Sequence, residues 1–258
     1  MKPSRSSAAN RWSDHYTRKA KQEDFPARSV YKLQEIQAKF KILRKNASVL
    51  DLGCAPGSWL KYAAQLVGPE GRVIGVDRSP VAIALPSQAR AMVGDVTDAS
   101  VMDAVEGRFD VVMSDMAPST TGQKDVDAAR SLELCRIALS IAQDRLLPGG
   151  SFVCKIFQGE DVECFVREVK DLFLRHAIFK PSSCRKASKE IYIIGIGKKS
   201  HRDPASDSTS FIDDTIPENH EMFGRKPCPA TTNGPRSNTR REPRMPAEGA
   251  SSPGSSRS

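Results

Sequence analysis

The chain has 258 residues, of which 39% are hydrophobic and 27% are charged, a composition typical of a globular protein in water. No apolar run reaches the roughly 20 residues that span a bilayer, and the first residues lack the apolar core of a secretory signal. This composition excludes a membrane protein and predicts a cytoplasmic one. The formal net charge is +8, and residues 1–50 hold 12 Lys and Arg against 4 Asp and Glu, so the excess lies in the first fifth of the chain.

Residues 1–27 are predicted to form a basic N-terminal arm that is only partly ordered. Such an arm suits binding to a phosphate backbone, because each neutralised phosphate releases counterions. Trp12, Tyr16 and Tyr31 are candidates for stacking on unpaired bases. The alternative is a flexible leader that only aids solubility.

The folded domain is predicted to cover residues 28–199 and to begin with an amphipathic helix. Apolar residues recur at helical spacing over 29–43, and Lys32 lies beside this apolar stripe. Strands and helices then alternate. The predicted strands are 48–52, 72–77, 91–94, 109–115, 151–157, 176–180 and 190–197. The predicted helices among them are 58–67, 98–106, 125–147 and 161–174.

This alternation of helices with apolar, β-branched strands indicates an α/β fold with a doubly wound, mostly parallel sheet covered on both faces. The last two predicted strands are joined by a loop without a helix. Parallel neighbours need a long crossover, so this pair is expected to be antiparallel. The sequence therefore predicts a seven-stranded sheet with an antiparallel strand near one edge.

Residues 200–258 have a different composition and are predicted to be a disordered tail. They hold 8 of the 17 prolines and only two aromatic residues. A segment of this kind buries too little apolar surface to offset its chain entropy.

Acidic residues follow four of the predicted strands: Asp51, Asp77, Asp95 and Asp115. In open α/β sheets, ligands bind outside the carboxyl ends of the strands. A carboxylate after the second strand usually binds a ribose diol, and Asp95 is suited to an adenine amine. The alternative for Asp77 and Asp95 is a structural role in a turn or at a helix N-terminus.

The turn after the first strand reads DLGCAPGSW, with Gly53 and Gly57 allowing a ligand close to the backbone. It is not the G-x-G-x-x-G fingerprint of dinucleotide binding. A cofactor without phosphates, with an amino-acid end and a nucleoside end, fits this turn better. A metal site is not expected, because the six cysteines form no CxxC pair and there are only four histidines.

Taken together, these stretches resemble the FtsJ-like family of 2′-O-ribose RNA methyltransferases. The matching stretches are NRWSDHYTRKA (10–20), RSVYKLQEI (28–36), DLGCAPGSW (51–59), GVDRSP (75–80), GD (94–95), SDMAP (114–118), GGSFVCKIFQGE (149–160) and SKEIYI (188–193). The resemblance implies the class I S-adenosylmethionine-dependent methyltransferase fold, with S-adenosyl-L-methionine as cofactor. The bacterial members are most similar, which implies methylation of a uridine ribose in large-subunit 23S rRNA.

The resemblance also implies the roles of particular residues. The family's catalytic tetrad corresponds to Lys32, Asp115, Lys155 and Glu190, with Lys155 as the proton acceptor. The residues implied to contact the cofactor are Gly57, Trp59, Asp77, Asp95 and Asp115. For Trp59, packing beside the cofactor is an equally good interpretation. Ser58 and Ser119 depart from the family pattern.

The tetrad also makes chemical sense without the resemblance. A ribose hydroxyl is a poor nucleophile, so the enzyme must align it and help to remove its proton. Lys155 lies in an apolar strand, where desolvation and Lys32 favour the neutral amine, while Asp115 and Glu190 favour the charged form. The resting protonation state of Lys155 therefore stays open. Structural roles also remain open for Lys32, as the polar side of a helix, and for Glu190, as a charge at a strand edge.

Other functions agree less well with these residues. A nucleotide-dependent oxidoreductase is disfavoured by the absence of G-x-G-x-x-G, and a non-catalytic RNA-binding ribosome-assembly factor would not need a lysine inside a strand. Transfer RNA or an mRNA cap is the alternative substrate, and the sequence does not exclude transfer RNA. The partner is expected to be RNA, with no DNA and no membrane. A monomer is expected because nothing in the sequence requires a dimer.

Overall fold

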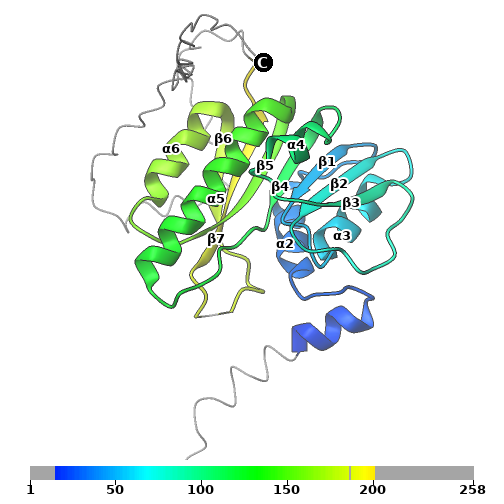
Figure 1. Cartoon of the computed structure of the whole chain (residues 1–258), viewed down its shortest axis with the longest axis horizontal. Helices are drawn as coiled ribbons and strands as arrows, with labels where there is room; N and C mark the ends of the chain where they lie inside the picture. Colours follow the sequence, from blue (N-terminus) through cyan, green and yellow to red (C-terminus); the bar gives the residue numbers. More distant parts are fainter. Residues whose placement is uncertain (1–14, 186, 201–258) are drawn as a thin grey trace, which may run out of the picture. The chain divides into compact units, whose positions relative to one another are not determined.

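The computed structural model describes residues 15–185 and 187–200 (Figure 1). Within these residues, no helix is both long enough and apolar enough to cross a membrane. The predicted tail from residue 201 onward and the first 14 residues, including Trp12, lie outside the described residues.

Seven strands form one sheet, and helices lie between most of them. The strands are β1 (Ser48–Leu52), β2 (Arg72–Asp77), β3 (Ala89–Val93), β4 (Phe109–Ser114), β5 (Leu146–Phe157), β6 (Phe173–Phe179) and β7 (Glu190–Lys198). The helices are α2 (Val30–Phe40), α3 (Ser58–Val67), α4 (Ala99–Asp103), α5 (Lys124–Arg145) and α6 (Val162–Leu172). A further helix covers residues 15–22.

The strand order is β3-β2-β1-β4-β5-β7-β6, so the order reverses between β1 and β4. All pairs among β1 to β5 are parallel, whereas β7 runs antiparallel to both β5 and β6. The predicted doubly wound sheet and its antiparallel strand are therefore confirmed. A loop without a helix joins β6 to β7, which is why these two strands can only pair antiparallel.

Helices cover both faces of the sheet, as Figure 1 shows. One face packs against α2 and α3 through residues such as Leu33, Ile36 and Leu60. The other packs against α4, α5 and α6 through residues such as Leu139 and Phe165. Because side chains alternate along a strand, each central strand contributes to both cores, and charged side chains at its end lie on one face or the other.

Several boundaries differ from the prediction by one to three residues, and the start of β5 differs by five. β5 begins at Leu146 and not at residue 151, because the Pro-Gly-Gly stretch that follows the predicted helix lies inside the strand. It causes a register shift against β4 between Phe109 and Val111, the kind of irregularity that proline and glycine favour in a strand. β6 begins at Phe173, directly after α6, and not at residue 176.

The helix over residues 15–22 packs next to α2. Ala20, Phe25, Val30 and Tyr31 are buried together in a small apolar cluster. The Tyr31 hydroxyl donates to Glu23 Oε2 at 3.0 Å, and the side chain is only 4% exposed. The prediction that Tyr31 stacks on a base is therefore wrong, because its ring is committed to this cluster.

Candidate active site

The carboxyl ends of β1, β2 and β3 carry the first group of predicted site residues. Asp77, which ends β2, accepts hydrogen bonds from the backbone N–H of Ala55 at 3.0 Å and of Ser79 at 2.7 Å. Asp77 therefore connects the glycine-containing turn after β1 to the turn after β2. These bonds are the structural role that the sequence left open, and they leave the carboxylate at the ligand-binding edge of the sheet.

Asp95 lies at the neighbouring turn, after β3. Its carboxylate accepts from the backbone N–H of Thr97 at 2.9 Å and forms an ion pair with Arg78. Hydrogen bonds from Thr97 are the main reason that the pKa of Asp95 lies below its ordinary value, with a smaller contribution from Arg78. Asp95 is thus a carboxylate that stays ionised beside Asp77.

The turn after β1 has no room for side chains at its two glycines. Gly57 has a φ of +107°, and a Cβ there would lie 2.8 Å from Val81 Cγ1. Gly53 has a φ of +78°, and its Cβ would lie 2.6 Å from Met116 Cγ. Both the conformation and the close contacts require glycine. The turn therefore brings bare backbone to the carboxyl edge of the sheet.

Asp51 lies beneath this turn and is fully buried. Neither of its carboxylate oxygens has a hydrogen-bond partner within the described residues. Burial, together with the charges of Asp115 and Asp77, holds the pKa of Asp51 well above its usual range. The sequence grouped Asp51 with the other strand-end carboxylates but did not predict that it is unpartnered, because this depends on what surrounds it in the fold.

Trp59, in the first turn of α3, is 3% exposed. Its indole N–H donates to the backbone carbonyl of Ser29 at 2.8 Å, and its ring lies 5.8 Å from that of Tyr192. Trp59 therefore anchors the start of α2 against α3. Contact between Trp59 and a cofactor stays a prediction.

The ends of β4 and β5 bring Asp115 and Lys155 together. Lys155 Nζ lies 3.0 Å from Asp115 Oδ1 and also donates to the Asp115 backbone carbonyl. The Lys155 side chain is 7% exposed and that of Asp115 is 17% exposed. An ion pair this shielded from water interacts strongly, so Lys155 and Asp115 hold each other in position.

Tyr192, on β7, is a central residue of the site that the sequence analysis did not single out. Its hydroxyl donates to Asp115 Oδ1 at 2.8 Å, and it lies directly opposite Lys155 in the strand register. Burial, with the charges of Asp115 and Glu190, raises the pKa of Tyr192 well above its ordinary value, so the phenol stays a donor. The available signal was the spacing, because Glu190 and Tyr192 are two apart and share one face of a strand.

Lys32 and Glu190 form a second, partly buried ion pair beside Tyr192. Lys32 Nζ lies 2.8 Å from Glu190 Oε2, and the two side chains are 12% and 14% exposed. Lys32 Nζ also lies 6.0 Å from the centre of the Tyr192 ring. The structure therefore brings all four residues of the predicted tetrad together, as two ion pairs on either side of Tyr192.

The loop that leads to Glu190 is held by α2 and by Arg28, two residues before the start of α2. Glu35 accepts backbone N–H bonds from Ser182 at 2.6 Å and Ser183 at 2.8 Å, and Arg28 donates to the Ser183 carbonyl at 2.9 Å. Burial alone would raise the pKa of Glu35, but the hydrogen bonds from Ser183 and Ser182 outweigh it and lower the pKa. These bonds fix Glu190 relative to Lys32.

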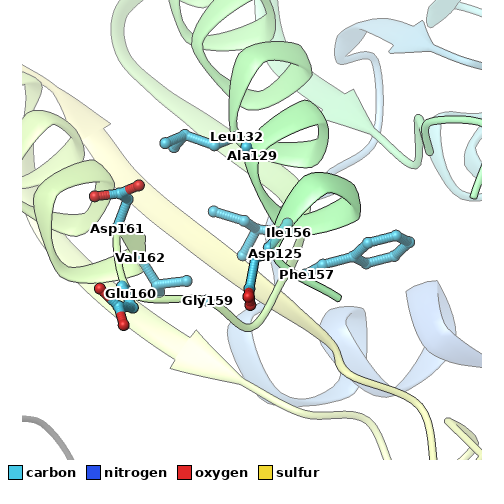
Figure 2. Close-up of a pocket in the computed structure, with 10 residues that line it drawn as sticks. Asp125, Ala129, Leu132, Ile156, Phe157, Gly159, Glu160, Asp161 and Val162 are labelled. Atoms are coloured by element: carbon cyan, nitrogen blue, oxygen red, sulfur yellow. The ribbon is translucent and has the colours of Figure 1, made fainter. Parts of the chain in front are cut away.

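A cavity of about 280 Å³ lies on the face of the sheet that packs against α5 and α6, between the start of α5 and the loop after β5 (Figure 2). Asp125, Glu160 and Asp161 are among its lining residues. Three carboxylates make this cavity unsuited to a phosphate. Among residues 15–185 and 187–200, no three His, Cys, Asp or Glu side chains are arranged to hold a metal ion.

The chain matches the family model described as FtsJ-like methyltransferase over residues 25–198. It is 59% identical to a protein named Ribosomal RNA large subunit methyltransferase E from Desulforapulum autotrophicum, over 74% of this chain and 95% of that protein. It is 48% identical to a protein of the same name from Bdellovibrio bacteriovorus, over 72% of this chain and 97% of that protein.

Two solved structures have a similar fold. A ribosomal RNA methyltransferase from Plasmodium falciparum superposes with a TM-score of 0.57 at 23% identity, over 67% of this chain and 98% of that one. Fibrillarin from Aeropyrum pernix, solved with bound S-adenosyl-L-methionine, superposes with a TM-score of 0.51 at 19% identity, over 65% of this chain and 76% of that one. With the strand order above, these likenesses confirm the predicted class I methyltransferase fold.

Proposed function

The chain belongs to the FtsJ-like methyltransferase family, and on this premise we propose that it methylates a uridine 2′-hydroxyl in large-subunit 23S rRNA, with S-adenosyl-L-methionine as the methyl donor. The relatives named for large-subunit rRNA are 48% to 59% identical over most of their length, which supports this substrate. The observation that carries the proposal is the buried tetrad, in which Lys155 and Asp115 meet at the edge where the strand order reverses.

The residues at the carboxyl ends of β1, β2 and β4 fit this cofactor. It is a sulfonium cation with an ammonium group, and Asp51, Asp77 and Asp115 are close enough for their charges to interact. The oxygens of Asp51 have no hydrogen-bond partner within the described residues, and Gly53 and Gly57 let the backbone of the turn pass close to Met116 and Val81. When bound, the cofactor supplies an activated methyl group.

We assign the individual roles as follows. Asp77 and Asp95 bind the ribose and adenine of the cofactor, Gly57 and Trp59 line its site, and Asp115 lies nearest to its methyl-donor end. Lys155 Nζ orients the ribose hydroxyl of the substrate and, once deprotonated to the neutral amine, accepts the hydroxyl proton. The Asp115 carboxylate and backbone carbonyl both contact this amine, so they stabilise the ammonium that the proton transfer produces.

Lys32 and Glu190 position the substrate ribose and are neutral as a pair. Their ion pair lies beside Tyr192, whose hydroxyl holds Asp115. Because both pairs are shielded from water, the positions of their polar atoms are held before substrate binds. The protein acts on RNA in the cytoplasm, as a monomer, with no DNA and no membrane partner.

Transfer of labelled methyl groups tests this function. The full chain is incubated with methyl-labelled S-adenosyl-L-methionine and either large ribosomal subunits, protein-free 23S rRNA or transfer RNA. We expect label in 23S rRNA, at a single uridine whose 2′-hydroxyl is blocked against alkaline cleavage.

Two results would contradict the proposal. Label found only in transfer RNA would mean that the substrate is transfer RNA and not 23S rRNA. Binding to rRNA without any transfer, from protein shown by a thermal shift to bind S-adenosylhomocysteine, would instead indicate a non-catalytic assembly factor.

A further inference from the structure

A second cavity, of about 330 Å³, lies at the opposite end of the sheet from the proposed methyl-transfer site. Its lining comes from the end of α2 and the segment after it, from the start of β5, and from β6 and β7. The lining residues are Phe40, Lys41, Ile42, Arg44, Gly149, Ser151, Arg175, Ile196 and Gly197.

The strand register relates this cavity to the tetrad. Ser151, Ile196 and Arg175 lie opposite one another on β5, β7 and β6, so they form one row across three strands. Lys155 and Tyr192 form a parallel row four residues further along the same face. At about 3.3 Å per residue, the two rows are roughly 13 Å apart.

The charged lining is entirely positive. Lys41, Arg44 and Arg175 are exposed, and their side chains form no hydrogen bond or ion pair with any described residue. No carboxylate is among the lining residues. The negative end of the α2 dipole accounts for a cation at Lys41, but it does not account for Arg175 on a strand. Three unpaired cations around one hollow therefore indicate an anionic ligand.

The floor of the cavity provides a second, independent feature. Ser151 is 5% exposed, and its hydroxyl has no hydrogen-bond partner among the described residues. It lies in the same row as Arg175, where it can donate to an oxygen that the guanidinium also binds.

We propose that this cavity binds a backbone phosphate of the RNA, as a contact point separate from the methyl-transfer site. Guanidinium groups match the geometry of phosphate oxygens, and the proposed substrate is a polyanion. A protein partner fits less well, because protein interfaces have an apolar centre and the exposed lining here is cationic. The inference rests on the proposed function, since that function supplies the RNA.

The test compares two double variants that each remove two positive charges. Arg44→Gln/Arg175→Gln changes the cavity, and Arg90→Gln/Lys170→Gln changes exposed cations on β3 and α6. Binding to a fragment of large-subunit rRNA is measured by fluorescence anisotropy across a KCl series, with methyl transfer measured in parallel. Arg44→Lys/Arg175→Lys keeps the charges and serves as the conservative variant.

For the cavity variant, we expect the slope of log affinity against log salt to become shallower by about 1, for the one phosphate contact that is lost. We expect the KM for RNA to rise roughly tenfold and kcat at saturating RNA to stay unchanged. The lysine variant should keep the slope of the unmodified protein. The β3 and α6 control should change neither the slope nor KM.

A slope equal to that of the control would overturn the inference. Weaker binding to assembled large subunits, with unchanged binding to free rRNA, would also overturn it, because the ligand would then be an acidic protein. These outcomes are separate from the proposed function, since that function fails only if the unmodified chain transfers no methyl group to rRNA.

Discussion

The two halves of the carboxyl-terminal edge of the sheet hold their charged residues in different ways. At the ends of β2 and β3, Asp77 and Asp95 bind backbone N–H groups two residues further along the chain. At the ends of β4, β5 and β7, the partners are 40 to 158 residues apart in sequence. The first half is built by local turns, and the second by strand pairing and by the packing of α2.

The charged side chains of the two halves also differ in how far they are exposed to solvent. Arg78, the partner of Asp95, has a side chain that is 76% exposed, whereas Lys155 is 7% exposed. A surface ion pair is screened by water and contributes little, while a shielded pair responds strongly to the loss of one partner. Substitutions in the two halves should therefore affect different quantities, cofactor affinity in the first and the rate of transfer in the second.

The largest effect is expected for Lys155→Ala, in the second half. Removing the proton acceptor should lower kcat by about 10²-fold to 10⁴-fold, while affinity for S-adenosylhomocysteine persists because the cofactor half is unchanged. Methyl transfer and a thermal shift with S-adenosylhomocysteine measure the two quantities. Near-normal turnover by this variant would rule out Lys155 as the proton acceptor.

Asp77→Ala, in the first half, should act on affinity. Loss of a charged hydrogen-bond acceptor costs about 1.5–3 kcal/mol, so the Kd for S-adenosylhomocysteine should rise roughly tenfold to a hundredfold. Calorimetric titration measures this change, and Asp77→Asn, which keeps an acceptor oxygen, should be affected less. A lowered kcat at saturating cofactor, with unchanged Kd, would place Asp77 with the transfer residues instead.

Tyr192→Phe tests how the second half is positioned. The change removes the hydroxyl that donates to Asp115 at 2.8 Å and leaves the ring in place. We expect kcat to fall about tenfold, the size of one hydrogen bond to a charged group, and the pH dependence of kcat to shift. If only the melting temperature falls and the pH–rate profile is unchanged, Tyr192 has a purely structural role.

The smallest effect is expected for Asp51→Asn, and it concerns stability. Because the folded pKa of Asp51 is raised, the folded state binds more protons than the unfolded state above about pH 4, the ordinary value of an aspartate. Its contribution to stability therefore falls as pH rises from there through the raised folded pKa.

Asp51→Asn removes this titration. The free energy of unfolding should change little near pH 4 and should increase by on the order of 1 kcal/mol at pH 8 relative to the unmodified chain. Urea denaturation at a series of pH values measures it, with Asp110→Asn as a control on the same sheet. A pH dependence identical to that of the unmodified chain would mean that Asp51 is ionised in the folded state.

The sequence predicts the two halves of this edge to different extents. The strand-end carboxylates and the glycine turn are local patterns, so their place on the sheet was predictable from alternation and spacing. Lys32 and Glu190 are 158 residues apart, and their pairing came only from the resemblance to a family. Their cofactor and catalytic roles stay predictions.

Several features follow only from the fold. Tyr192 and the hydroxyl of Ser151 have no local signal, because their importance depends on neighbours from other strands. The sequence alone makes Tyr31 a candidate for stacking on RNA, but its packing with Ala20 and Phe25 buries the ring. The early start of β5 likewise depends on pairing with β4, which overrides the tendency of Pro148 and the glycines to form a turn.

The sequence by itself determined the order of the elements, the antiparallel last strand and the chemistry available at the edge of the sheet, because these depend on residue type and short-range spacing. The tertiary structure alone decided which side chains are shielded from water and which are left without a partner. Burial and pairing are properties of contacts between distant segments, and they set how strongly a charged group interacts.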